Sequence, residues 1–145
     1  MQAPTSVSTV AHVIQLAVAP VFLLTGVGAI LGVLVNRLGR VVDRFRTLES
    51  GLVAAATAQP GYAVEMEILS RRARMIHWAI GLCTGCALLV CIVIAALFVS
   101  SVTTADLSGV VAALFIAAML TLVAGLLCFL REIALATGGI HVVPR

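Results

Sequence analysis

The chain of 145 residues is 62% apolar and 10% charged, with a formal net charge of +3 and a mean hydropathy of +1.21. A soluble domain carries about 25% charged residues, because its surface faces water. The composition therefore excludes a cytosolic enzyme, a nucleic-acid-binding module and a secreted disulfide scaffold. It predicts instead that most of the surface faces lipid.

Three long segments lack charged residues and are predicted to span a membrane. No Asp, Glu, Lys or Arg occurs in 1–36, 75–105 or 107–130. A bilayer core of about 30 Å needs about 20 helical residues, so each segment holds one helix. We place the spans at 13–35, 75–99 and 110–130. The predicted fold is all-α, a single polytopic membrane domain over residues 1–145 with three transmembrane helices.

All nine basic residues are arginines, and their distribution predicts the orientation. Seven lie between the first two spans and two follow the third, whereas the N-terminal segment and 100–109 contain none. By the positive-inside rule the N-terminus lies outside, and the long connection and the C-terminus lie in the cytoplasm. The predicted cytoplasmic basic cluster consists of Arg37, Arg40, Arg44, Arg46, Arg71, Arg72 and Arg74.

Apolar residues at heptad spacing run through the connection 36–74. The first series is Leu34, Leu38, Val41, Phe45, Leu48 and Leu52, and the second is Tyr62, Met66, Leu69, Ala73, Ile76 and Ile80. Both series continue into the neighbouring spans. The first two helices are therefore predicted to extend into the cytoplasm as an antiparallel helical hairpin with a turn at Pro60 and Gly61. The alternative is a solvated amphipathic loop.

The heptads also suggest a register for this hairpin. It pairs Leu34 with Ile80 near the membrane and Leu52 with Tyr62 at the far end. Two pairs of opposite charges then face each other, Asp43 with Arg71 and Arg46 with Glu67.

The first predicted helix carries a second pattern on the side opposite its apolar series. At about 100° per residue, six small and polar residues fall within about 80° of one another. We call this set the small-residue stripe: Thr25, Gly28, Gly32, Asn36, Gly39 and Asp43. Small residues let another backbone approach closely, so the stripe predicts a packing partner.

Two partners for the stripe are open. One is the third helix of the same subunit, which offers the small residues Ala113, Ala117, Ala118 and Gly125. The other is the same helix of further subunits, arranged around an axis as a homo-oligomer. In that case the stripe lines a polar path for ions, with Arg40 and Arg44 at its cytoplasmic mouth.

No motif for catalysis, a cofactor or a metal ion emerges. Cys83 and Cys86 form a C-x-x-C, but Cys91 and Cys128 fall at other depths, so a packing role is expected. No carboxylate lies within a predicted span, which disfavours transmembrane catalysis and proton-coupled transport. We expect no enzyme activity, no catalytic residue, no cofactor, no bound metal and no nucleic-acid partner.

Three stretches carry a resemblance to a known family. They are A-P-V-F-L-L-T-G from Ala19, N-R-L-G-R from Asn36 and F-L-R-E from Phe129. With the segments around them, the chain resembles a family of small bacterial inner-membrane proteins catalogued only as a domain of unknown function. The resemblance implies a three-span protein of the bacterial inner (plasma) membrane and supplies no activity, cofactor or catalytic residue.

Two classes of function therefore remain. The favoured one is a homo-oligomeric ion channel or pore lined by the first helix. The alternative is a non-catalytic membrane scaffold or regulatory subunit. Its basic hairpin would bind a cytoplasmic partner, or its arginines would bind anionic lipid headgroups.

Overall fold

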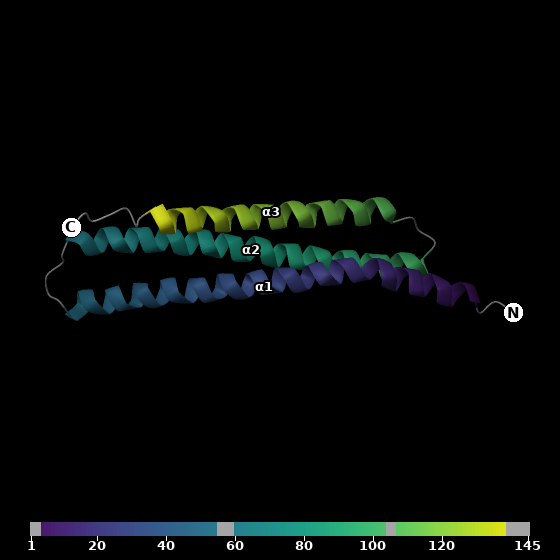
Figure 1. Ribbon diagram of the computed structural model, residues 1–145, viewed down its shortest axis with the longest axis horizontal. Helices are drawn as coiled ribbons and strands as arrows, with labels where there is room; N and C mark the ends of the chain where they lie inside the picture. Colours follow the sequence, from purple (N-terminus) through teal and green to yellow (C-terminus); the bar gives the residue numbers. More distant parts are fainter. Residues whose placement is uncertain (1–3, 55–59, 104–106, 139–145) are drawn as a thin grey trace.

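The computed structural model describes residues 4–54, 60–103 and 107–138, which form three long α-helices (Figure 1). Helix α1 is Pro4–Ala54, α2 is Pro60–Val102 and α3 is Ser108–Gly138. No strand occurs in these ranges, so the all-α prediction is confirmed. Helix α2 lies between α1 and α3 and packs against both of them.

All three helices are long and apolar enough to cross a membrane, as the sequence predicted. At a rise of 1.5 Å per residue, the 51 residues of α1 and the 43 of α2 extend about 77 Å and about 65 Å. Both exceed the bilayer core of about 30 Å by a wide margin. In Figure 1 the ends of α1 and α2 that face each other across 55–59 continue beyond the C-terminal end of α3, so the predicted antiparallel hairpin is present.

The heptad residues form the contact between α1 and α2. Leu34, Val41 and Leu48 of α1 are buried, and Leu69 and Ile76 of α2 are buried with them. Partly buried residues fill the positions between these, namely Leu38, Phe45, Ala73 and Ile80. The side chains of the predicted Leu52–Tyr62 pair lie outside the described part of the chain. Long amphipathic helices pair in this way because each buries one apolar stripe against the other.

The predicted charge pairs and the predicted turn need correction. Neither Asp43–Arg71 nor Arg46–Glu67 forms an ion pair, and all four side chains are exposed. Arg44 instead binds Glu65 across the hairpin, with Nη2 donating to Oε1 over 2.9 Å. Heptad spacing selects the contacting faces, but a series of similar aliphatic residues fits a partner in several registers.

The residues predicted to form the turn lie within a helix. Helix α2 begins at Pro60 itself, so Pro60 and Gly61 belong to the helix. Proline suits a first helical turn because its fixed φ is already helical and that turn needs no N–H donor.

Helix α3 packs on a face of α2 that adjoins the one covered by α1. Ala79, Cys83 and Cys86 of α2 are fully buried, as is Ala118 of α3. The backbones come closest at Gly125, where an added Cβ would lie 3.1 Å from Sγ of Cys83 and 3.5 Å from the carbonyl oxygen of Ala79. Of the small residues of α3, Gly125 therefore serves the contact with α2 and Ala118 is buried in the core, whereas Ala113 is exposed. Of the two partners left open for the stripe of α1, the third helix does not cover its glycines, because a Cβ added at Gly28, Gly32 or Gly39 meets no atom within 4 Å.

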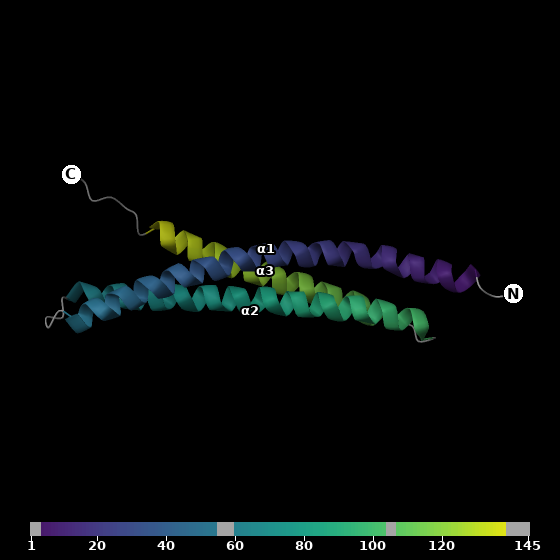
Figure 2. The same ribbon diagram turned by 90° about the horizontal axis from the view of Figure 1, so that it is seen from below.

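Helices α1 and α3 have few direct contacts. Toward the N-terminal end of α3 an apolar cavity of about 510 Å³ lies between the three helices, and its lining includes Pro20, Val93 and Phe115. Figure 2 shows that α3 crosses the hairpin obliquely. The two outer helices therefore depend on contacts near the other end of α3 for their relative position.

Most of the apolar surface stays outside the bundle. Phe22, Leu88 and Leu120 are 73%, 61% and 65% exposed, and many other large apolar side chains also face outward. Such a surface is unfavourable in water and suits the hydrocarbon core of a bilayer.

Prediction on the hairpin: Leu48→Ala should destabilise the far end of α1 by about 2 to 5 kcal/mol, because Leu48 is 5% exposed and its removal leaves a cavity. The matched control Glu49→Ala alters the exposed neighbouring side chain and should change stability by about 0.5 kcal/mol or less. Hydrogen exchange of the α1 amides in the full-length protein measures both. Equal exchange in the two variants would contradict a packed hairpin.

Candidate functional site

A buried carboxylate lies at the end of the bundle where the arginines gather. Glu132 belongs to α3, two residues after the predicted third span ends at Leu130, and it is 1% exposed. It is the only charged side chain in the described part of the chain that is buried to this degree. A carboxylate removed from water requires charged partners, because its desolvation costs several kcal/mol.

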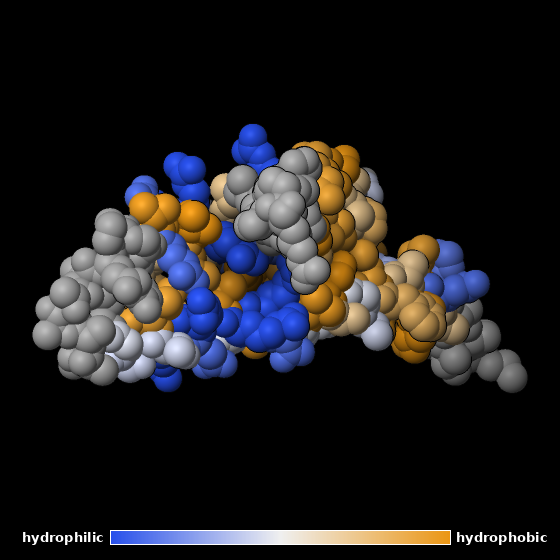
Figure 3. Space-filling model, turned by 60° about the vertical axis from the view of Figure 1, so that its left-hand side comes forward, coloured by the Kyte–Doolittle hydropathy of each residue, from blue (hydrophilic) through white to orange (hydrophobic). Residues whose placement is uncertain are grey.

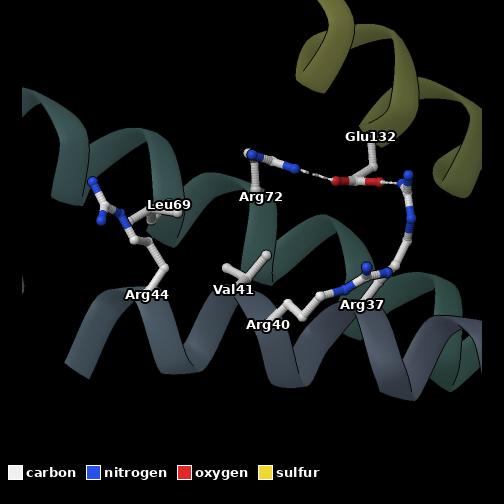
Figure 4. Close-up of a pocket in the computed structure, with 7 residues that line it drawn as sticks. All are labelled: Arg37, Arg40, Val41, Arg44, Leu69, Arg72 and Glu132. Atoms are coloured by element: carbon white, nitrogen blue, oxygen red, sulfur yellow. Dashed lines mark hydrogen bonds and ion pairs between the residues drawn. The ribbon is translucent and has the colours of Figure 1, made fainter. Parts of the chain in front are cut away.

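Two arginines from different helices supply those partners (Figure 4). Arg37 of α1 donates from Nη1 to Oε2 of Glu132 over 2.5 Å. Arg72 of α2 donates from Nη2 and Nε to Oε1 over 3.0 and 3.3 Å. We call this set the Arg–Glu–Arg triad. It joins all three helices at a single level.

Arg37 holds α3 at a second point. Its guanidinium carbon lies 5.4 Å from the centre of the Phe129 ring, within cation–π distance. Phe129 and Glu132 are three residues apart and therefore share one face of α3. That face is turned toward Arg37, so one arginine fixes both the rotation and the depth of the end of α3.

A polar cavity of about 300 Å³ adjoins the triad, and we call it the arginine pocket. Its lining consists of Arg37, Arg40, Val41, Arg44, Leu69, Arg72 and Glu132. The three α1 arginines lie on one side of that helix because they are spaced by three and four residues. Figure 3 shows hydrophilic surface around a recess at this end of the molecule and hydrophobic surface beyond it.

The charges that line the pocket are only partly balanced. Arg44 binds Glu65, and Arg37 and Arg72 share the single carboxylate of Glu132. Arg40 has no hydrogen-bond or ion-pair partner within the described ranges. In Figure 4 its side chain extends along α1 toward Arg37. The pocket therefore has a net positive charge.

The structure divides the predicted basic cluster into two groups. Arg37, Arg40, Arg44 and Arg72 converge on the arginine pocket. The remaining members, Arg46, Arg71 and Arg74, are exposed and have no ion-pair partner among the described residues. Spacing alone did not separate the groups, since both occur on the same two helices.

The small-residue stripe stays uncovered within the chain. All six of its residues are exposed. A Cβ added at Gly28, Gly32 or Gly39 would meet no atom within 4 Å. Thr25 satisfies its own hydroxyl by donating to the carbonyl of Val21 over 3.4 Å. The stripe is thus a separate surface that borders the pocket at Arg40.

The cysteines form no metal centre in the described residues. Cys83 and Cys86 are buried in the contact between α2 and α3, Cys91 is exposed and Cys128 is partly buried. No group of three or more His, Cys, Asp or Glu side chains in the described ranges has the geometry to hold a metal ion.

Sequence reasoning missed Glu132, although a signal was present. The search for carboxylates stopped at the predicted end of the third span, and Glu132 lies just beyond it. An acidic residue that directly follows a long uncharged helix must find a partner at that depth. Arg37 follows the first predicted span and Arg72 precedes the second, so both lie on the same side of the membrane as Glu132 and at a similar depth. This shared depth could have indicated the contact from the sequence.

Comparison with known proteins assigns the chain to a family. It belongs to the family described as Protein of unknown function (DUF2721), whose model matches residues 17–142. The resemblance found in the sequence is therefore confirmed. No curated protein and no solved structure matches the chain.

Prediction on the triad: Glu132→Ala should destabilise the protein by about 2 kcal/mol, because two guanidinium groups lose their shared carboxylate. The loss is smaller than for a fully buried pair, since the side chains of Arg37 and Arg72 are 30% and 29% exposed and can reach water. Glu67→Ala removes an exposed carboxylate that has no partner among the described residues, and it serves as the control. Unfolding in mixed micelles measures both, and equal stabilities would contradict a structural triad.

Proposed function

We propose that this member of the DUF2721 family is a non-catalytic protein of the bacterial inner membrane that binds the phosphate group of an anionic lipid in the arginine pocket. One observation carries the proposal. Four arginines surround a cavity of about 300 Å³, and Glu132 is its single acidic lining residue in the part of the chain that the structure describes. Such a cavity attracts an anion of small molecular size.

The chemistry of the pocket favours phosphate among the anions. A guanidinium group presents planar N–H donors in a fork that matches two oxygens of a phosphate. Arg37 uses Nη1 alone on Glu132, and Arg40 uses no donor on any described residue. Several oriented donors therefore remain for a phosphate that enters from the open side of the pocket.

The depth of the pocket favours a lipid as the source of the phosphate. Arg37 is the first charged residue of the chain and follows the apolar segment of α1, while Glu132 follows that of α3. This is the level at which lipid phosphates lie. Basic pockets between transmembrane helices on the cytoplasmic side bind anionic headgroups, and the positive-inside rule places this end in the cytoplasm.

Prediction on lipid binding: Arg40→Gln should weaken the binding of anionic lipid by roughly five-fold, because each arginine near the surface contributes about 1 kcal/mol. Arg40 has no partner within the described residues, so its replacement leaves the triad intact. The matched control Arg46→Gln removes the same charge from the same helix outside the pocket and should change affinity less than two-fold. Native mass spectrometry of the purified full-length protein, titrated with phosphatidylglycerol or phosphatidate, gives both values.

Two results would contradict this proposal. Equal losses in the two variants would mean that charge spread over the surface, and not the pocket, attracts the lipid. Anionic lipid that binds no better than phosphatidylcholine to the wild-type protein would exclude the function altogether.

A second proposal concerns self-association through the small-residue stripe, the arrangement that an ion channel lined by α1 requires. The supporting observation is the open space over Gly28, Gly32 and Gly39, which no part of the described chain fills. Close backbone contact between two copies of α1 would cover it. Thr25 and Asn36 would then face the interface or an axial path for ions.

Prediction on self-association: Gly28→Leu should convert an oligomer to monomers without unfolding the chain, since a Cβ added there meets no described atom within 4 Å. Gly125→Leu should instead disrupt the subunit itself, because α2 lies against that position. Gly26→Leu adds the same bulk at an exposed glycine about 100° around the helix from Thr25, off the stripe, and should have no effect. Light scattering in detergent measures the mass. A wild-type protein that is monomeric in this measurement would contradict both self-association and a channel lined by α1.

A further inference from the structure

We infer that the lipid group bound in the arginine pocket is a phosphomonoester, which has three terminal oxygens and up to two negative charges, in preference to a phosphodiester. This inference rests on the proposed lipid-binding function. Two observations support it. One is the net positive charge of the pocket, and the other is the set of arginine N–H donors that bind no described residue.

The charge balance leaves two positive charges in the pocket. Arg44 is paired with Glu65 over 2.9 Å. Arg37 and Arg72 share Glu132, so together they retain one charge, and Arg40 contributes the other. A phosphodiester brings one negative charge, whereas a phosphomonoester brings up to two. The monoester therefore neutralises the pocket and the diester does not.

The unused donors match three oxygens. Arg37 has Nη2 and Nε available, since only its Nη1 bonds to Glu132. Arg72 bonds through Nε and Nη2, which leaves Nη1. Arg40 offers its whole guanidinium group. Of the four guanidinium groups that line the cavity, that of Arg44 is held by Glu65 and lies apart from the other three in Figure 4. A phosphomonoester presents three terminal oxygens to those three groups, where a diester presents two.

The pocket lacks a site for a headgroup cation. Glu132 is its only acidic lining residue in the described ranges, and both carboxylate oxygens accept hydrogen bonds from arginines. With 1% of its surface exposed, Glu132 offers nothing to an ammonium group. Headgroups that place a cation beside their phosphate therefore leave that cation opposite arginines, which disfavours zwitterionic lipids.

The preference should depend on pH through the lipid. A phosphomonoester loses its second proton at about pH 6, whereas a diester has no second proton to lose. The charged groups that face the ligand are Arg37, Arg40 and Arg44 from α1, Arg72 from α2 and Glu132 from α3, with Glu65 behind Arg44. No histidine or cysteine lines the pocket within the described ranges.

Phosphatidate and phosphatidylmethanol test the inference directly. Phosphatidylmethanol is phosphatidate with one methyl ester on its phosphate, so it differs by one charge and one terminal oxygen. We expect the full-length protein in phosphatidylcholine nanodiscs to bind phosphatidate roughly five-fold more tightly at about pH 8, one unit charge being the difference. The preference should vanish at about pH 5, where both lipids have one charge. Arg40→Gln should reduce it at about pH 8, and Arg46→Gln should preserve it.

The outcomes separate this inference from the proposed function. Equal binding of both lipids at about pH 8, weakened for both by Arg40→Gln, would overturn the phosphomonoester and leave the lipid-binding function standing. Failure of both lipids to compete with phosphatidylcholine would overturn the function as well. Glycerol 3-phosphate carries the same group without acyl chains and should not displace phosphatidate at equal concentration. Displacement would overturn the assignment to a lipid.

Discussion

The rest of this structure depends on one carboxylate shared by two guanidinium groups. Helix α2 packs against both neighbours through apolar and small residues, but α1 and α3 have few contacts and are separated by a cavity toward the N-terminal end of α3. Glu132 joins them through Arg37 and ties both to Arg72. In lipid no hydrophobic force drives helices together, so such a polar contact sets the geometry that apolar side chains leave open.

The same arrangement explains why the site is positively charged. A buried ion pair gives little net stability compared with apolar packing, because desolvation offsets much of the attraction. Two arginines on one carboxylate add a further charge that the protein does not neutralise. That excess lies beside Arg40 in the arginine pocket, so the contact that positions α3 also holds the guanidinium donors that the proposed anion would bind.

Three faces of helix α1 differ in what they contact. One face packs on α2 through the heptad residues, the next lines the arginine pocket, and the small-residue stripe faces outward with no contact over its glycines. The proposed lipid binding and the proposed self-association would therefore use neighbouring surfaces, and one would not exclude the other. A second copy seated on the stripe would lie beside Arg40, next to a lipid held in the pocket.

The sequence by itself determined the three apolar helices, the hairpin and the faces that meet in it, because segment length and residue period follow from local geometry and the bilayer thickness. Tertiary structure decided the rest. The register of α1 on α2 was open since Leu and Ile interdigitate at several offsets, and the Arg44–Glu65 pair appears only in the folded hairpin. Likewise the sequence left open whether Gly125 packs against α1 or α2, and the folded structure places it against α2. Glu132 lies sixty residues or more from its partners in the chain, and only the packing of three helices brings them within bonding distance.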